Sequence, residues 1–261
     1  MTATTAGPAP TAQLRSGRGP ISFSPTYLAL DIRRSLRNRR TLIFLLVMPV
    51  AFFLLFGGGY RNSDPAAFVY VMVSMSVYGA MIATTSTGAQ VSVERSQGWT
   101  RQLRLTPLRP TGYVLTKVAS ALVLGIVPVV MVLAVGAIMG ANLSLGEWLA
   151  VGALSWVCSL VFAAFGLFVG YLVPAENAMQ FIGPLLALMS FFGGLFQPLN
   201  TMPQALQNIA PWMPTYAVGL VARSPITHSG MTPAHVGDLV LWTAIFGIGT
   251  ALLFRRDTSR V

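Results

Sequence analysis

Six long apolar stretches restrict what this chain can fold into. They cover residues 42–59, 66–89, 114–140, 148–173, 179–199 and 236–254. A helix rises 1.5 Å per residue, so about 20 apolar residues cross a hydrocarbon core about 30 Å thick. Only 9% of the residues are charged, against about 25% in soluble domains. The sequence therefore predicts an all-α integral membrane protein, with a domain of six transmembrane helices over residues 41–255 and a short tail at 256–261.

The sequence before the first apolar stretch has two parts. Residues 1–23 are rich in Thr, Ala, Gly and Pro, which predicts a disordered tail. Residues 24–40 predict an amphipathic helix, because Ser24-Pro25 suits an N-cap followed by the first helical position. Its two faces carry Leu28, Ile32 and Leu36 on one side, and Arg33, Arg34 and Arg37 on the other. We expect this helix to lie in the membrane interface, with its arginines near anionic lipid headgroups.

Most of the positive charges fall on one side of this topology, and only Arg61 and Arg223 fall on the other. The tail and first helix hold seven of the 17 Lys and Arg residues, the loop after the second span with the start of the third holds five, and the C-terminus holds three. The positive-inside rule then places both termini and that loop in the cytosol. The net charge of +10 is accounted for in this way, and no nucleic-acid partner is predicted.

The loop after the second span, residues 94–110, is the longest polar interruption between spans. Its sequence, ERSQGWTRQLRLTPLRP, repeats residue types at helical spacing. The pairs are Trp99 with Leu103 on one face and Arg101 with Arg104 on another. Thr106-Pro107 ends the pattern, because proline cannot donate to the helical ladder. The pattern predicts a cytosolic helix over about 92–106 that docks on a partner; a solvated loop that only fixes orientation is the alternative.

A proline-rich segment, residues 200–235, separates the fifth and sixth spans. Its prolines are Pro203, Pro211, Pro214, Pro225 and Pro233. The half-apolar stretch around 202–210 is too short to cross a membrane. We expect this segment to dip into the outer leaflet or to lie on it.

The chain lacks a motif with which it could bind and hydrolyse ATP itself. It has no G-x-x-x-x-G-K-[ST] phosphate loop, and its only lysine, Lys117, follows Thr116. Lys117 and Asp238 lie near span ends, where they are expected to reach water, so a proton-driven antiporter is disfavoured. We therefore expect no cofactor on this chain, and any uphill transport requires another subunit.

An intramembrane hydrolase is the alternative from a different class. His228 and His235 are the only histidines, and their spacing is not that of a metal pair on a helix. Ser229 lies beside His228, but a serine next to a histidine is common by chance. The single cysteine, Cys158, lies in an apolar run and predicts an inert structural thiol. We predict no catalytic residue and no metal site.

Two motifs resemble those of a known family. The pattern Glu94-x-x-x-Gly98-Trp99-x-x-x-Leu103-x-x-Thr106-Pro107 resembles the coupling-helix signature of type-2 ABC exporter permeases, including the daunorubicin-resistance type. Residues 191–216, FFGGLFQPLNTMPQALQNIAPWMPTY, are similar to the family's fifth span and outer re-entrant helices. The matching positions there are Pro198, Met202, Pro203, Ile209, Ala210, Pro214 and Tyr216. The resemblance covers about residues 25–255, and Trp99 departs from it, because many members have a small hydroxyl residue there.

The resemblance implies a non-enzymatic permease subunit of an ATP-driven exporter in the bacterial plasma membrane. It implies two copies of a cytosolic ABC ATPase that hold ATP and Mg, and a second permease copy or a homologous permease. ATP closes the ATPase dimer, which pushes on the coupling helices and shifts the spans from inward-open toward outward-open. In this arrangement Trp99 and Leu103 insert into an ATPase groove. Glu94, Arg101 and Arg104 form ion pairs at the rim of the groove, and Gly98 permits close approach. Thr106 and Pro107 end the helix.

The fifth span supplies the candidate cargo path. Its large, adaptable side chains are Phe181, Met189, Phe191, Phe192 and Phe196, with Gln197 as a polar group. They favour a hydrophobic or amphipathic cargo, drug-like as in multidrug efflux and antibiotic resistance, or lipid-like; packing or lipid contact is the alternative role. A permease for a polyprenyl-linked glycan or another envelope lipid is the alternative function. Small residues at Gly166, Gly170 and Gly193-Gly194 are expected to permit close helix packing.

Overall fold

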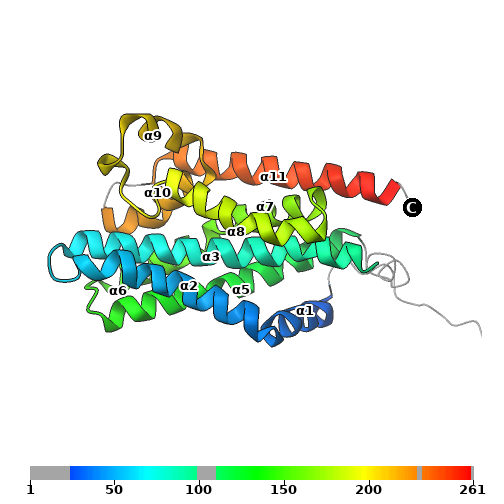
Figure 1. Cartoon of the computed structure of the whole chain (residues 1–261), viewed down its shortest axis with the longest axis horizontal. Helices are drawn as coiled ribbons and strands as arrows, with labels where there is room; N and C mark the ends of the chain where they lie inside the picture. Colours follow the sequence, from blue (N-terminus) through cyan, green and yellow to red (C-terminus); the bar gives the residue numbers. More distant parts are fainter. Residues whose placement is uncertain (1–23, 99–109, 228–230, 260–261) are drawn as a thin grey trace, which may run out of the picture.

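The computed structural model describes residues 24–98, 110–227 and 231–259, and these ranges contain helices and turns but no strand (Figure 1). Five helical stretches are long and apolar enough to cross a membrane. They are Leu42–Tyr60, Pro65–Ser96, Thr111–Ile138, Leu145–Leu172 and Pro233–Arg256. The expected all-α membrane protein is therefore confirmed.

The long helices run along the length of the molecule and define two ends (Figure 1). In chain order they are α1 Pro25–Arg37, α2 Arg39–Gly57, η1 Gly58–Tyr60, α3 Pro65–Ser96, α5 Pro110–Ile138, α6 Leu145–Cys158, α7 Leu160–Leu172, α8 Ala175–Phe192, η2 Leu199–Thr201, α9 Gln204–Ile209, η3 Ala210–Trp212, α10 Pro214–Thr227 and α11 Pro233–Ser259. We call the end that holds α1 and the last turns of α11 the α1 end, and the opposite end the α9 end.

The fifth predicted span, 179–199, corresponds to α8, which ends at Phe192. This helix is not among the five that are apolar enough to cross. The cause lies in its first turns, where Glu176, Asn177 and Gln180 are polar. It packs along α3 nevertheless, so α8 is the candidate for the sixth span, and the count of six stays a prediction.

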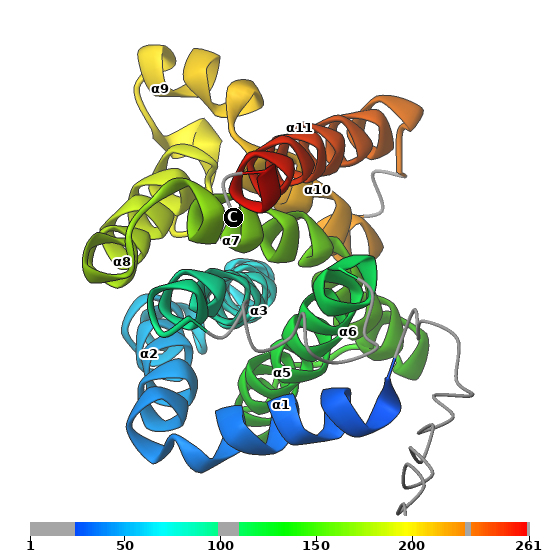
Figure 2. The same cartoon turned by 90° about the vertical axis from the view of Figure 1, so that its right-hand side faces the viewer.

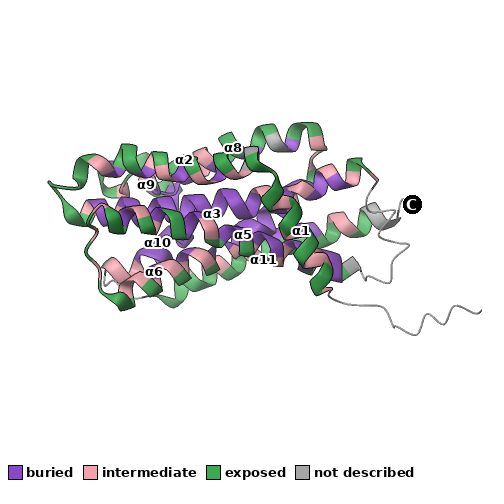
Figure 3. Cartoon of the chain, turned by 90° about the horizontal axis from the view of Figure 1, so that it is seen from below, coloured by how far each residue is buried: buried purple, intermediate pink, exposed green. Residues whose placement is uncertain are grey.

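Helix α3 forms the centre of the bundle. It is buried along most of its length and packs against α2, α5, α7 and α8 (Figures 2 and 3). Its 32 residues extend about 48 Å, which exceeds a hydrocarbon core of about 30 Å. Helix α3 is therefore longer than such a core is thick, and its last turns lie at the α1 end (Figure 1).

Glycines allow α3 and α7 to touch backbone to backbone. A Cβ added to Gly166 would lie 2.3 Å from the carbonyl oxygen of Thr85, and one on Gly170 would lie 3.2 Å from the Cα of Ala89. Gly193 has the same function where α8 meets α10. The close packing expected of these small residues is confirmed.

Helix α1 lies across one end of the bundle, over α5 (Figure 2). Its predicted start is confirmed: Pro25 occupies the first position and the Ser24 hydroxyl accepts a hydrogen bond from the Tyr27 amide at 3.3 Å. The helix ends earlier than the predicted range of 24–40, because α1 ends at Arg37 and Arg39 already begins α2.

The proline-rich segment enters the bundle farther than expected. Helix α9 has six residues and cannot cross, as the sequence indicated. Helix α10, however, packs on α6, α11 and α3, and most of its residues are buried, Arg223 included. The family-motif residues take separate places: Pro198 and Pro203 precede η2 and α9, Met202 is buried, Pro214 begins α10, and Tyr216 is half-buried. Helix α10 is therefore a buried part of the bundle, and the location of the segment in or on the outer leaflet stays a prediction.

The glycine contact between α3 and α7 predicts a stability effect. Gly166→Ala would force two backbones apart, and we expect the free energy of unfolding to fall by about 1–3 kcal/mol, as for other overpacked sites. Thermal unfolding of the purified protein in detergent measures this. Gly247→Ala in α11 is the control, because among the described residues no atom beyond its chain neighbours and its own helix backbone lies within 4 Å of the added Cβ. Equal stability of the two variants would contradict the contact.

Candidate functional site

The structure describes two of the eight residues assigned to the coupling segment. Glu94 belongs to the last turns of α3, so the predicted start of a separate helix at about 92 falls inside α3. Gly98 follows α3 with a φ of 70°, a left-handed conformation that favours glycine and commonly ends helices. No described atom of this chain lies within 4 Å of a Cβ built on Gly98, and its close approach to a partner stays a prediction. The other six, Trp99, Arg101, Leu103, Arg104, Thr106 and Pro107, lie outside the described residues.

A buried group of charged residues joins the two helices that flank residues 99–109. The Lys117 ammonium on α5 donates to Asp31 Oδ1 on α1 at 2.6 Å and to Glu94 Oε1 on α3 at 2.7 Å. The Tyr113 hydroxyl donates to Glu94 Oε2 at 2.6 Å. Arg34, more than half exposed, lies 3.4 Å from Glu94 at the edge of the group. We call Asp31, Glu94, Tyr113 and Lys117 the Lys117 cluster.

The cluster corrects two expectations. Glu94 was expected to form ion pairs at an exposed rim, but it is 2% exposed and faces inward. Lys117 was expected to reach water, but it is fully buried. Both side chains stay inside because opposite charges neutralise one another: Lys117 lies between two carboxylates, and Arg34 offsets the second negative charge.

Sequence analysis missed two members of this cluster, Tyr113 and Asp31, and Asp31 is the charged one. It lies four residues after Tyr27 and four before Ser35, on the face of α1 that turns inward. The signal was present, since Asp31 is the only acidic residue in an arginine-rich helix and Lys117 is the only lysine of the chain. Pairing them required contact over 86 positions in the sequence, which local patterns do not contain.

A second contact ties the end of α3 to α7. Arg95 donates to the carbonyl oxygens of Gly170 at 3.3 Å and Tyr171 at 3.0 Å, and its guanidinium lies 5.3 Å from the centre of the Tyr171 ring. The last carbonyls of a helix lack partners within the helix, and a cation there is favourable. The chain that enters residues 99–109 is therefore anchored to α1, α5 and α7.

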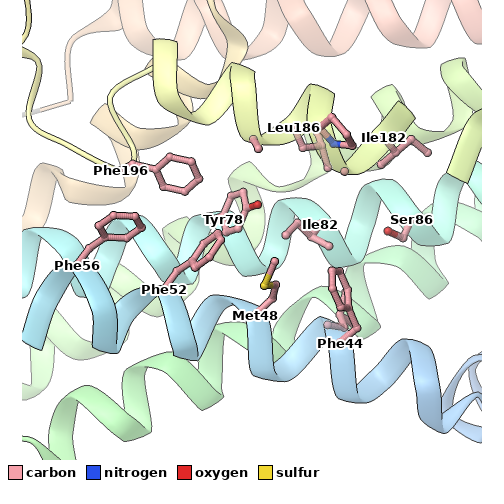
Figure 4. A pocket seen from close by; sticks show the side chains of 14 residues that line it. Phe44, Met48, Phe52, Phe56, Tyr78, Ile82, Ser86, Ile182, Leu186 and Phe196 are labelled. Atoms are coloured by element: carbon pink, nitrogen blue, oxygen red, sulfur yellow. The ribbon is translucent and has the colours of Figure 1, made fainter. Parts of the chain in front are cut away.

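An apolar cavity of about 530 Å³ lies between α2, α3 and α8 (Figure 4). It is lined by Phe44, Leu45, Met48, Phe52 and Phe56 from α2, by Tyr78, Ile82 and Ser86 from α3, by Ile182, Gly183, Pro184, Leu186 and Ala187 from α8, and by Phe196. Phe196 lies 5.0 Å from Tyr78 between ring centres and closes one end of the cavity. This size and lining suit an apolar organic group.

One of the six residues of the candidate cargo path lines this cavity. Phe196 does so, whereas the other five are absent from its lining. Their places are as follows: Phe181, Phe191 and Gln197 are exposed, and Met189 and Phe192 are half-buried. The lining residues from α8 instead include Ile182 and Leu186, whose aliphatic side chains sequence analysis did not single out.

We predict that removal of the cation from the Lys117 cluster greatly lowers the stability of the protein. In Lys117→Met two buried carboxylates lose their partner, and we expect the free energy of unfolding to fall by about 3–5 kcal/mol. Chemical denaturation followed by tryptophan fluorescence measures the change. The control Arg34→Met removes a mostly exposed cation and should cost less than about 1 kcal/mol. A Lys117→Met protein as stable as the control would show that the cluster does not hold the helices together.

Comparisons with known proteins agree with this architecture. Residues 26–224 match the family model described as ABC-2 type transporter. The chain is also 28% identical over 234 residues to a protein of Bacillus subtilis (strain 168) named "Putative transport permease YvfS", and the match covers 88% of this chain and 96% of that protein. The family match spans more than half of the chain. The chain therefore belongs to the ABC-2 type transporter family, as a multi-pass membrane permease subunit of an ABC transporter.

Proposed function

We propose that this permease exports a hydrophobic or amphipathic compound, drug-like or lipid-like, across the bacterial plasma membrane. The energy comes from ATP and Mg bound to a separate ATPase subunit, since the sequence contains no phosphate-loop motif. The observation that carries the proposal is the Lys117 cluster. It connects both flanks of residues 99–109, the proposed ATPase contact, to α1 and to the central helix.

The working complex in this proposal holds two ATPase copies and two permeases, either identical or homologous. Its ATPases bind at the α1 end, which faces the cytosol. The charge distribution supports this orientation: α1 carries exposed arginines at positions 33, 34 and 37, whereas Arg61 is the exposed one near the α9 end. The same arginines place α1 against anionic lipid headgroups.

The force of ATPase closure enters through Trp99 and Leu103 and leaves through the helices that flank them. At the near flank Glu94 and Arg95 connect α3 to α5, α1 and α7. At the far flank Tyr113 and Lys117 connect α5 to the same carboxylates. A push on residues 99–109 then moves these four helices together and alters the space between α2, α3 and α8.

The cavity between those helices is the proposed cargo site. Its apolar walls and the two polar side chains at Tyr78 and Ser86 fit an amphipathic molecule. Phe52, Phe56 and Phe196 present flat, adaptable surfaces that accept different shapes.

Leu103→Asp tests the coupling segment. A carboxylate cannot enter an apolar ATPase groove, so we expect ATP-dependent export to fall at least tenfold while the protein stays in the membrane. Efflux of a fluorescent amphiphile from proteoliposomes with the ATPase is the measurement. Leu145→Asp, at an exposed leucine that begins α6 near the α9 end, is the matched control and should export normally. Normal export by Leu103→Asp would remove this role.

Phe196→Ala tests the cavity. The change removes aromatic surface from one wall, and we expect the half-saturating cargo concentration to rise roughly tenfold, since an aromatic deletion in a pocket costs on the order of 1–3 kcal/mol. Phe181→Ala is the matched control, because Phe181 is 63% exposed and does not line the cavity. The assay is concentration-dependent efflux. Equal effects of the two substitutions would show that the cavity is not part of the cargo path.

A further inference from the structure

Arg223 is a buried arginine that neither the Lys117 cluster nor the cavity lining contains. It lies on α10 and is 4% exposed. Its Nη1 donates to the Ser74 hydroxyl at 2.9 Å, and its guanidinium carbon lies 4.4 Å from the centre of the Tyr70 ring. Within residues 24–98, 110–227 and 231–259 no carboxylate forms an ion pair with it, in contrast to Lys117, which has two.

The surroundings of Arg223 are shaped to hold a guanidinium. A Cβ built on Gly219, one turn earlier on α10, would lie 2.8 Å from Arg223 Nη2, so the glycine provides the space. The Tyr70 ring covers one face of the guanidinium, an arrangement that stabilises a cation. Ser74 accepts from one of its five N–H donors. A buried cation inside a membrane bundle is expensive without an anion, and such residues commonly mark ligand paths.

Arg223 and the apolar cavity contact successive parts of α3, along a row of residues that winds about 40° around the helix at each step of four. Tyr70 and Ser74 contact Arg223, and Tyr78, Ile82 and Ser86 line the cavity, so the contacts follow at four-residue spacing along the helix. Tyr70 is the nearest of these residues to the α9 end, and Ser86 is the farthest from it.

A short segment, residues 194–196, lies between Arg223 and the cavity. The Tyr70 hydroxyl donates to the Gly194 carbonyl at 2.7 Å, and Leu195 lies against Gly219. Phe196, the next residue, lines the cavity. Gly194 has a φ of 71°, and this non-helical turn follows the end of α8 directly. Displacement of residues 194–196 would open a continuous space between the Arg223 guanidinium and the apolar cavity.

We propose that Arg223 binds the anionic headgroup, a carboxylate or a phosphate, of an amphipathic cargo whose apolar part occupies the cavity. This inference rests on the proposed function and narrows its cargo to anionic amphiphiles. It favours an envelope lipid over a cationic drug, because a buried cation repels the latter. Guanidinium groups bind both anions through paired hydrogen bonds.

Equilibrium binding to the purified permease in a nonionic steroid detergent tests this. The probes share a dodecyl chain: dodecyl phosphate, dodecanoate and dodecyltrimethylammonium. We expect the two anionic probes to bind at least about tenfold more tightly than the cationic one, and inorganic phosphate not to compete, because the chain is needed. Arg223→Gln should weaken anionic binding roughly tenfold to a hundredfold and leave cationic binding unchanged or stronger.

Two variants control for charge and fold. Arg223→Lys keeps the cation and should retain part of the preference, and Arg61→Gln removes an exposed arginine near the same end and should retain all of it. Equal affinity for all probes, equal weakening of all probes by Arg223→Gln, or no binding of any probe would overturn the inference. Export without charge preference would overturn the role of Arg223 and leave the proposed function standing. Charge-selective binding without ATP-driven export would support the role of Arg223 and contradict the proposed function.

A thiol-labelling experiment covers the case in which Arg223→Gln does not fold. Ser74→Cys in a Cys158→Ala background places the single thiol beside Arg223. With the ATPase and ATP present, an anionic methanethiosulfonate should react at least about tenfold faster than a cationic one, since the nearby cation attracts it. Dodecyl phosphate should slow this reaction. Equal rates, a faster cationic reagent or no reaction would each contradict an anion site that opens to the path.

Discussion

The ion pairs of Lys117 with Asp31 and Glu94 constrain the rest of this structure. Each of these side chains is buried, and a buried charge that loses its partner costs about 3–5 kcal/mol. Helices α1, α3 and α5 therefore cannot separate at the α1 end without a large penalty. Arg95 extends the constraint to α7, whose terminal carbonyls it binds. Four helices that come from distant parts of the sequence are thereby held as one unit beside residues 99–109, which is what transmission of a mechanical push requires.

The packing between α2, α3 and α8 is of a different kind. It consists of aromatic and aliphatic contacts around a cavity, and these have no strict directional requirement. The α9 end adds a helix, α10, that enters the bundle with an arginine held by a hydroxyl and a ring rather than by a carboxylate. The molecule thus combines a buried charged connection at the α1 end with an apolar region around a cavity. In the proposed function the first would carry force and the second would change shape around the cargo.

The sequence predicted what depends on local chemistry. Five apolar stretches form helices of spanning length, Ser24-Pro25 begins α1, and Gly166 and Gly170 permit close packing with α3, because hydropathy, capping and residue size act over a few residues. It failed where distant residues meet. Glu94 and Lys117 appeared exposed because their partners were unknown, and the burial of α10 among other helices was not predicted for residues 200–235. Of the cargo-path residues only Phe196 reaches the cavity, because α8 turns one face toward α3 and composition does not say which.

The central claim is that the Lys117 cluster transmits force as well as stabilising the fold, and a neutral replacement separates the two roles. Asp31→Asn, Glu94→Gln and Lys117→Gln together remove all three charges while keeping groups that hydrogen-bond, so the fold is expected to survive. The decisive measurement is the amount of amphiphile exported per ATP hydrolysed by this triple variant with its ATPase in proteoliposomes. We predict a folded complex that hydrolyses ATP but exports several-fold less per ATP than the native protein. Unchanged export per ATP would show that the charges hold the helices together without coupling them to the ATPase.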